Sequence, residues 1–168
     1  MTIKNSMQLH EVAKIVVRGT NWLGDAVMSM PALDRLRNSF PSSQITLLAP
    51  PRSSEILTGH RAVDRIVPYL RKEQGTKAFY ETLRFMRQER FDIAILFQNA
   101  FEAGLLAFLG GARIRVGYDT QGRGLLLNHP VVAPLKPSNR HETYAYLDLI
   151  AEAERAVLGL TPGASQSN

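Results

Sequence analysis

One acidic residue, Asp25, directly follows a loop that Gly19 and Gly24 bracket. The loop comes after the apolar segment 14–18, and Asp25 lies where a segment of helical periodicity begins. A helix N-terminus carries partial positive charge and unpaired N–H groups, so it stabilises one carboxylate and excludes a second anion from the same place. The loop therefore predicts chemistry that uses a carboxylate.

Two phosphate-binding motifs are similar to this loop, and each fails at specific positions. A P-loop requires Gly, four residues, and then Gly-Lys-Ser or Gly-Lys-Thr. Gly19 and Gly24 have that spacing, but Asp25 and Ala26 replace the lysine and the hydroxyl. A dinucleotide-binding loop requires Gly-x-Gly-x-x-Gly and an acidic residue about 20 positions later. The next apolar segment ends in Pro50 instead, which argues against NAD binding here.

The composition is typical of a globular protein with anionic partners. The 168 residues suit one domain, and the absence of cysteine excludes disulfides and thiolate metal sites. The four histidines have no metal-ligand spacing, so we expect no metal site. The net charge of +5 does not choose among nucleic acid, anionic lipid and a phosphorylated sugar. Since no segment has the pattern of a signal sequence or a membrane span, we expect a cytoplasmic protein.

Short apolar segments alternate with segments of helical periodicity along the chain. We expect strands at residues 14–18, 44–49, 65–68, 92–97 and 113–116. We expect helices at residues 25–40, 52–57, 77–90, 102–109 and 141–158. This alternation predicts an α/β fold with a Rossmann-like, doubly wound parallel sheet.

Ligands of such sheets bind beyond the carboxyl ends of the strands. We expect three polar loops there, at residues 19–25, 98–101 and 117–124. They carry carboxylate, amide and guanidinium groups between apolar elements, including Asn21, Asn99 and Arg123. A polar, hydroxyl-rich ligand would suit these loops.

Two blocks of the sequence resemble a known family. The first block, at residues 17–33, reads VRGTNWLGDAVMSMPAL. The second, at residues 97–118, reads FQNAFEAGLLAFLGGARIRVGY, and RGLLLNH at 123–129 and RHETYAYLDL at 140–149 follow it. In order and spacing these blocks resemble the lipopolysaccharide heptosyltransferases of glycosyltransferase family 9, and in particular its heptosyltransferase II members. The resemblance covers residues 14 to 150.

The resemblance implies one half of an enzyme with the GT-B architecture. Such enzymes face two Rossmann-like domains across a cleft, with the acceptor held mainly by the first and ADP-heptose by the second. This chain resembles the first domain only, which we place at residues 14–160, between an N-terminal extension at 1–13 and a flexible tail at 161–168. We therefore expect the C-terminal donor domain to be absent and the chain alone to be inactive. We expect no cofactor, because ADP-heptose is a substrate of the missing domain.

The reaction implied is inverting transfer of heptose from ADP-heptose to the inner core of lipopolysaccharide, at heptosyl-Kdo-lipid A. Asp25 matches the motif aspartate of the family and is the candidate catalytic base. The candidate acceptor-binding residues are the other loop residues of the first block and two residues of the second: Gly19, Thr20, Asn21, Trp22, Gly24, Asn99 and Arg123. Ala100 stands where the family often has serine, so one hydroxyl contact is lost.

Structural roles stay open for the same residues. Asp25 could be an ordinary helix cap, worth about 1 kcal/mol. Gly19 and Gly24 could be turn glycines, Trp22 could cover the core, and Arg123 could be a solvated surface charge.

The partners implied are the lipid A-linked inner-core oligosaccharide and ADP-heptose, with peripheral contact to the anionic inner face of the inner membrane as a further option. Nucleic acid is not expected, because basic residues are spread among acids and form no stripe interleaved with aromatics. A non-catalytic anion- or nucleotide-binding Rossmann-like module is the alternative.

Overall fold

A computed structural model describes residues 8–133 and 141–159. In this part of the chain six strands form one sheet, in the order β3-β2-β1-β4-β5-β6, and every neighbouring pair is parallel. The strands are β1 (Lys14–Arg18), β2 (Gln44–Ala49), β3 (Arg65–Pro68), β4 (Ile93–Leu96), β5 (Ile114–Tyr118) and β6 (His129–Val131). This is the order of a doubly wound Rossmann-like sheet, and the predicted fold class is confirmed.

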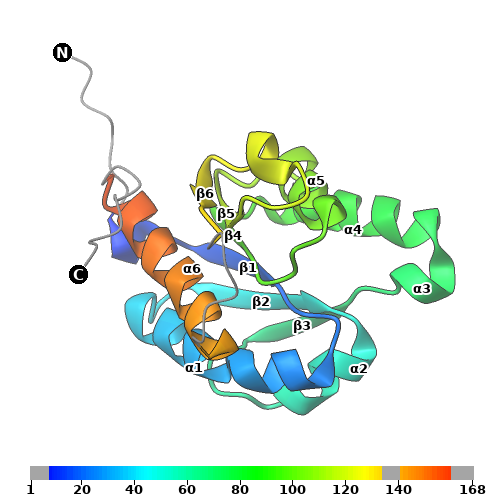
Figure 1. Ribbon diagram of the computed structural model, residues 1–168, viewed down its shortest axis with the longest axis horizontal. Helices are drawn as coiled ribbons and strands as arrows, with labels where there is room; N and C mark the ends of the chain where they lie inside the picture. The colour runs from blue at the N-terminus through cyan, green and yellow to red at the C-terminus, as the bar shows by residue number, and fades with distance from the viewer. Residues whose placement is uncertain (1–7, 134–140, 160–168) are drawn as a thin grey trace.

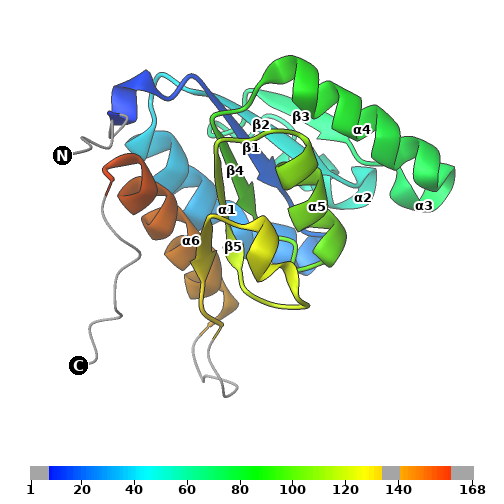
Figure 2. The same ribbon diagram turned by 90° about the horizontal axis from the view of Figure 1, so that it is seen from above.

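Helices cover both faces of the sheet (Figure 1, Figure 2). On one face, α1 (Leu23–Ser39) packs against α6 (Glu142–Val157). On the other face, α4 (Thr76–Glu89) packs against α5 (Phe101–Leu109). The short helices α2 (Pro51–Ser54) and α3 (Arg71–Gln74) follow β2 and β3.

The two faces have separate apolar cores because the strands alternate between them. Ile15 and Val17 of β1 pack in the core under α1 and α6, whereas Val16 packs in the core under α4 and α5. All three are at most 1% exposed. A strand buried on both faces must be apolar throughout, which explains why these strands read as continuous apolar runs.

The predicted elements differ from the observed ones in small, explicable ways. β1, β2 and β3 have the predicted bounds, and α1 begins two residues earlier than predicted. β6 was not predicted because it has three residues, one of them Pro130, and pairs along one side only. α3 was not predicted because it is one polar turn. Each missed element is too short to show a period.

The last residues of the predicted N-terminal extension, Val12 and Ala13, belong to the folded domain. Val12 is buried in the core, and the N–H of Ala13 donates to Asp92 Oδ2 at 2.9 Å. Residues 1–7 and the predicted tail at 161–168 lie outside the described residues. Among the helices that are described, none combines the length and apolarity needed to cross a membrane.

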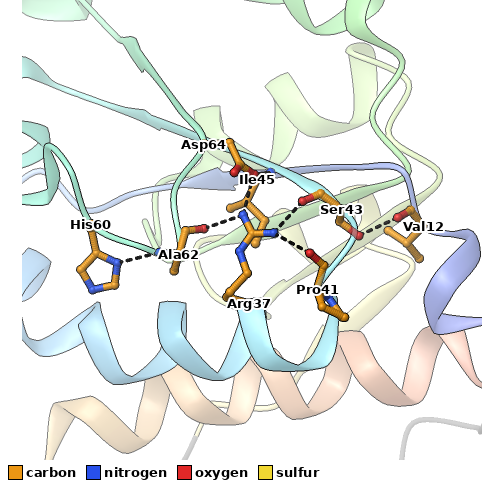
Figure 3. A network of polar contacts seen from close by, with 8 residues as sticks. All are labelled: Val12, Arg37, Pro41, Ser43, Ile45, His60, Ala62 and Asp64. Atoms are coloured by element: carbon orange, nitrogen blue, oxygen red, sulfur yellow. Dashed lines mark hydrogen bonds and ion pairs between the residues drawn. The ribbon is translucent and has the colours of Figure 1, made fainter.

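Arg37 makes a network of hydrogen bonds at the amino ends of β2 and β3, the edge of the sheet opposite the predicted site (Figure 3). Near the end of α1, Arg37 donates to Ser43 O at 2.8 Å, to Ala62 O at 3.2 Å and to Asp64 Oδ2 at 2.5 Å. Asp64 Oδ2 also accepts from the N–H of Ile45 at 2.7 Å. Buried backbone groups need such partners where strands begin.

Candidate active site

The loops after β1 and β4 meet at the carboxyl edge of the sheet. The backbone N–H groups of Phe97 and Gln98 both donate to Arg18 O, at 3.0 and 3.2 Å. β1 and β4 are neighbours from which the chain winds in opposite directions, so this is the switch point where such folds bind ligands. The predicted loops at 19–25, 98–101 and 117–124 follow β1, β4 and β5 and share this edge.

The two glycines of the first loop have different surroundings. A Cβ atom at Gly19 would lie 2.9 Å from Leu47 Cδ1 and 3.0 Å from Ala49 Cβ, so packing against β2 explains this glycine. A Cβ atom at Gly24 would meet nothing within 4 Å. Gly24 lies in the first turn of α1 and has no positive φ, so neither the backbone nor the packing requires a glycine there. The surface beside Asp25 is thereby left open.

The other residues of the first loop point in different directions. Thr20 is buried, and its hydroxyl donates to Trp22 O at 3.3 Å. Asn21 Oδ1 accepts from Arg18 at 3.2 Å. Trp22 is 65% exposed, with the Lys72 ammonium 5.8 Å from its ring centroid. The core-covering role left open for Trp22 is therefore wrong, and its ring is available for stacking.

Asp25 is half-buried in the first turn of α1, three residues after the N-cap residue Trp22. It is not the N-cap, and within the described residues its carboxylate makes no hydrogen bond or ion pair. Its charge is one of the causes, after burial, that raise the pKa of the Tyr146 hydroxyl of α6. A carboxylate free of protein partners can accept a hydrogen bond or a proton from a ligand hydroxyl.

Arg123 is fully buried, contrary to the surface-charge alternative. Its guanidinium donates to Tyr118 O at 2.8 Å, to Gln98 O at 2.6 Å and to Asn99 Oδ1 at 3.0 Å, with a longer contact to Ala100 O at 3.3 Å. Burial lowers the pKa of Arg123 to about 10, opposed by the charge of Asp119. Arg123 thus joins the second and third loops and orients Asn99, while its contact with an acceptor stays a prediction.

A pocket of about 470 Å³ opens between the loops after β1, β2, β3 and β4. Two predicted site residues, Asn21 and Trp22, line it, whereas Asp25, Asn99 and Arg123 do not. The remaining charged and aromatic lining residues were not predicted as site residues: Arg18, Arg52, Tyr69, Arg71, Lys72, Glu73 and Glu102. Four cationic side chains against two carboxylates make this an anion-attracting pocket.

A charge network forms the inner wall of the pocket. Arg18 is 6% exposed and its guanidinium lies 4.8 Å from the centroid of the Tyr69 ring. Tyr69 donates a short hydrogen bond to Glu102, which also accepts from Arg71 Nε at 2.9 Å. Burial raises the pKa of Tyr69, and the bond to Glu102 raises it further. The carboxylate is thus already neutralised, so the net charge left facing the pocket is positive.

Arg18 is the most informative of the residues that sequence reasoning missed. Its Nη1 donates to Gly19 O at 2.5 Å, but its buried Nε has no hydrogen-bond partner. Burial lowers the pKa of Arg18 to about 10, against the attraction of Tyr69 and Glu102. The signal available in the sequence was a charged residue at the end of the apolar run of β1. A buried guanidinium with an unsatisfied nitrogen is costly unless it binds something.

The pocket suits binding of a polar anionic molecule, and Asp25 follows two of its lining residues, Asn21 and Trp22, in the first loop. Across the described ranges, no group of three or more His, Cys, Asp or Glu side chains could hold a metal ion.

The sequence of this chain is similar to part of the sequences of two bacterial heptosyltransferases. A lipooligosaccharide heptosyltransferase 2 of Haemophilus ducreyi is 29% identical over 124 residues, which is 68% of this chain and 33% of the relative. Lipopolysaccharide heptosyltransferase 2 of Escherichia coli K12 is 29% identical over 118 residues, which is 68% of this chain and 34% of the relative. The chain spans about a third of the length of these relatives.

Solved structures share the fold. The chain superposes on Escherichia coli ADP-heptose lps heptosyltransferase II with a TM-score of 0.66 and 27% identity, covering 82% of this chain and 40% of that one. A family 9 glycosyl transferase of Veillonella parvula gives a TM-score of 0.72 over 96% of this chain and 46% of that one, and at 22% identity it supports the fold alone.

The sequence profile of glycosyltransferase family 9 (heptosyltransferase) matches residues 80–168. This match covers more than half of the 168 residues. The chain therefore belongs to glycosyltransferase family 9, the heptosyltransferases.

Proposed function

We propose that this chain is the acceptor-binding part of an inverting heptosyltransferase, which transfers heptose from ADP-heptose to heptosyl-Kdo-lipid A. The names of the relatives support lipopolysaccharide as the kind of acceptor and ADP-heptose as the donor. The observation that carries the proposal is the cationic pocket beside the Asp25 loop.

The pocket fits an acidic sugar. The guanidinium groups of Arg18 and Arg71 and the ammonium of Lys72 suit carboxylate or phosphate groups. The exposed ring of Trp22 lies at the same pocket and offers a stacking surface for a sugar ring. The inner-core acceptor offers both a carboxylate and a sugar ring, because Kdo is an acidic sugar.

Asp25 would act on the acceptor hydroxyl. As that oxygen forms a bond to the anomeric carbon of heptose, its proton passes to the Asp25 carboxylate. The bond from the anomeric carbon to the phosphate oxygen breaks on the opposite face, and ADP leaves with that electron pair. The half-buried carboxylate suits this role, because no donor among the described residues competes for it.

The donor would bind to a part of the enzyme that this chain does not span. We therefore expect the chain alone to bind acceptor, to need no cofactor, and to show no transfer. The site of action would be cytoplasmic, at the inner face of the inner membrane where lipid-linked acceptors lie.

NMR titration with a heptosylated inner-core oligosaccharide tests the proposal, with ADP as control. We expect shifts in the loops at 19–25 and 98–101 and near Tyr69 to Lys72, and none from ADP. Asp25→Asn should bind the oligosaccharide about tenfold more weakly with unchanged stability, because a charge-assisted hydrogen bond is lost. Binding of ADP without binding of the oligosaccharide would instead assign the chain to a nucleotide-binding module.

Replacement of Gly24 separates stability from function. Gly24→Ala should stabilise the fold by about 0.5–1 kcal/mol, because a helical glycine is replaced where there is room for Cβ. It should also weaken acceptor binding if the sugar approaches the backbone there. Urea denaturation and the same NMR titration measure both effects.

Gly19→Ala is the matched comparison. It should destabilise the fold by about 1–3 kcal/mol, because its Cβ would press on Leu47 and Ala49. If Gly24→Ala leaves oligosaccharide affinity unchanged, the backbone at this position does not contact the acceptor.

A further inference from the structure

The outward side of α4 carries a concentration of positive charge. Its basic face consists of the exposed residues Lys77, Tyr80, Arg84, Arg87 and the adjoining Arg90. A shallow hollow on this face is lined by Tyr80, Leu83, Arg84, Arg87, Gln88 and Arg90, without any carboxylate. α4 lies at one side of the molecule, with α3 beside its outer end (Figure 1, Figure 2).

The helix itself gathers these residues. Positions 77, 80, 84 and 87 follow one another at steps of three or four, so their side chains share one side of the helix. Met86 is buried in the core under α4 and α5, and Leu83, also part of that core, borders the hollow. In the sequence these basic residues are interspersed with acidic ones. The geometry of the helix places the basic side chains together on one side.

Among the described residues, the three arginines of this face lack counter-ions, whereas most other cations outside the face have one. Arg35, Arg61 and Arg113 each pair with a carboxylate elsewhere on the surface. In the described part of the chain, Arg84 and Arg90 make no ion pair, and Arg87 donates to Leu109 O at 2.9 Å. Glu81 is the one exposed carboxylate on α4, 3.7 Å from Lys77. The basic face therefore complements an anionic surface.

The basic face begins beside the pocket. Lys72 of α3 lines the pocket, and α4 starts at Thr76 after the single residue Gly75. From there the 14 residues of α4 extend for about 21 Å. If a ligand in the pocket is anchored in an extended anionic surface, that surface would lie close to α4.

We infer that the basic face of α4 rests on an anionic phospholipid bilayer while the pocket takes the sugar of a lipid-linked acceptor. The inference rests on the proposed function, because the lipid anchor of the acceptor supplies the bilayer. Arginines near such a surface attract anionic headgroups, and Tyr80, 68% exposed, has the amphipathic ring that favours the membrane interface. A nucleic acid is the less suitable occupant, since Tyr80 is the one exposed aromatic ring of this face.

Vesicle co-sedimentation of the whole chain tests the inference. We expect binding to vesicles of phosphatidylcholine mixed with phosphatidylglycerol, weakened by salt, and no binding to phosphatidylcholine alone. Arg84→Gln combined with Arg90→Gln should lower partitioning about 30-fold. The control is Arg61→Gln combined with Arg113→Gln, which removes two positive charges outside the basic face. It should change partitioning by less than about threefold, because only the net charge of the chain changes.

The outcomes separate the inference from the proposed function. Equal losses in both double variants, or binding to a DNA oligonucleotide but not to the mixed vesicles, would overturn the membrane assignment. Soluble oligosaccharide binding, measured by NMR on the same variants, should be unchanged. If the vesicles bind through α4 but the oligosaccharide does not bind, the proposed acceptor is wrong and the membrane surface stands.

Discussion

Replacing Arg123 with methionine should destabilise the fold by about 3–5 kcal/mol. The guanidinium is fully buried and satisfies backbone oxygens of Gln98 and Tyr118 together with the Asn99 side chain. Methionine fills similar space but donates nothing, so these buried acceptors would lose their partners, at about 1–3 kcal/mol each where no water replaces them. Urea denaturation should show a lower midpoint with an unchanged slope.

Arg113→Met is the control for this effect. Arg113 is largely exposed and lies 3.7 Å from Asp92, so its loss should change stability by less than about 0.5 kcal/mol. If both variants lose the same small amount, Arg123 does not hold the two loops together. If Arg123→Met is folded and binds oligosaccharide normally, the orientation of Asn99 is also irrelevant to the acceptor.

Replacing Arg18 with methionine should act in the opposite way, on binding and not on stability. Arg18 carries a buried Nε without a partner, and Leu48 O, its distant acceptor at 3.5 Å, also accepts from the N–H of Gly19. Methionine removes the cost of burying the charge, which offsets the hydrogen bonds lost to Gly19 O and Asn21 Oδ1. We expect stability within about 1 kcal/mol of the original, and oligosaccharide affinity lowered about 30-fold.

Two comparisons make the Arg18 result specific. Arg18→Lys keeps a charge but not the planar fork, so it should restore part of the affinity. A neutral oligosaccharide of the same size should bind Arg18→Met and the original chain equally. A variant that loses several kcal/mol of stability would show that Arg18 is a structural residue whose polar atoms are satisfied in solution.

The fold class was largely predictable from local patterns. Strands β1 to β3 match the predicted bounds because each is a short apolar run between breakers such as Pro50 and Gly19. The loops of the site followed from the same alternation, since parallel strands place their carboxyl ends at one edge. The missed elements, β6 and α3, are too short to carry a period.

The site was predictable in part. Asn21 and Trp22, which line the pocket, were predicted because they lie in one contiguous motif, and the role of Asp25 in the same motif stays a prediction. Arg18, Tyr69, Arg71 and Glu102 were missed because they come from β1, the segment after β3, α3 and α5, and each looks unremarkable in its own segment. Only their convergence shows a cationic pocket.

The sequence by itself determined the alternation of elements, the family and the carboxylate at the start of α1, because these depend on neighbours along the chain. The tertiary structure decided which charges are paired, which are buried and which face solvent. It showed that Arg123 is a buried link between loops, and among the described residues it left Arg18 Nε without a hydrogen-bond partner. Those outcomes depend on residues that are far apart in the sequence and that folding brings together, such as Arg18 and Glu102.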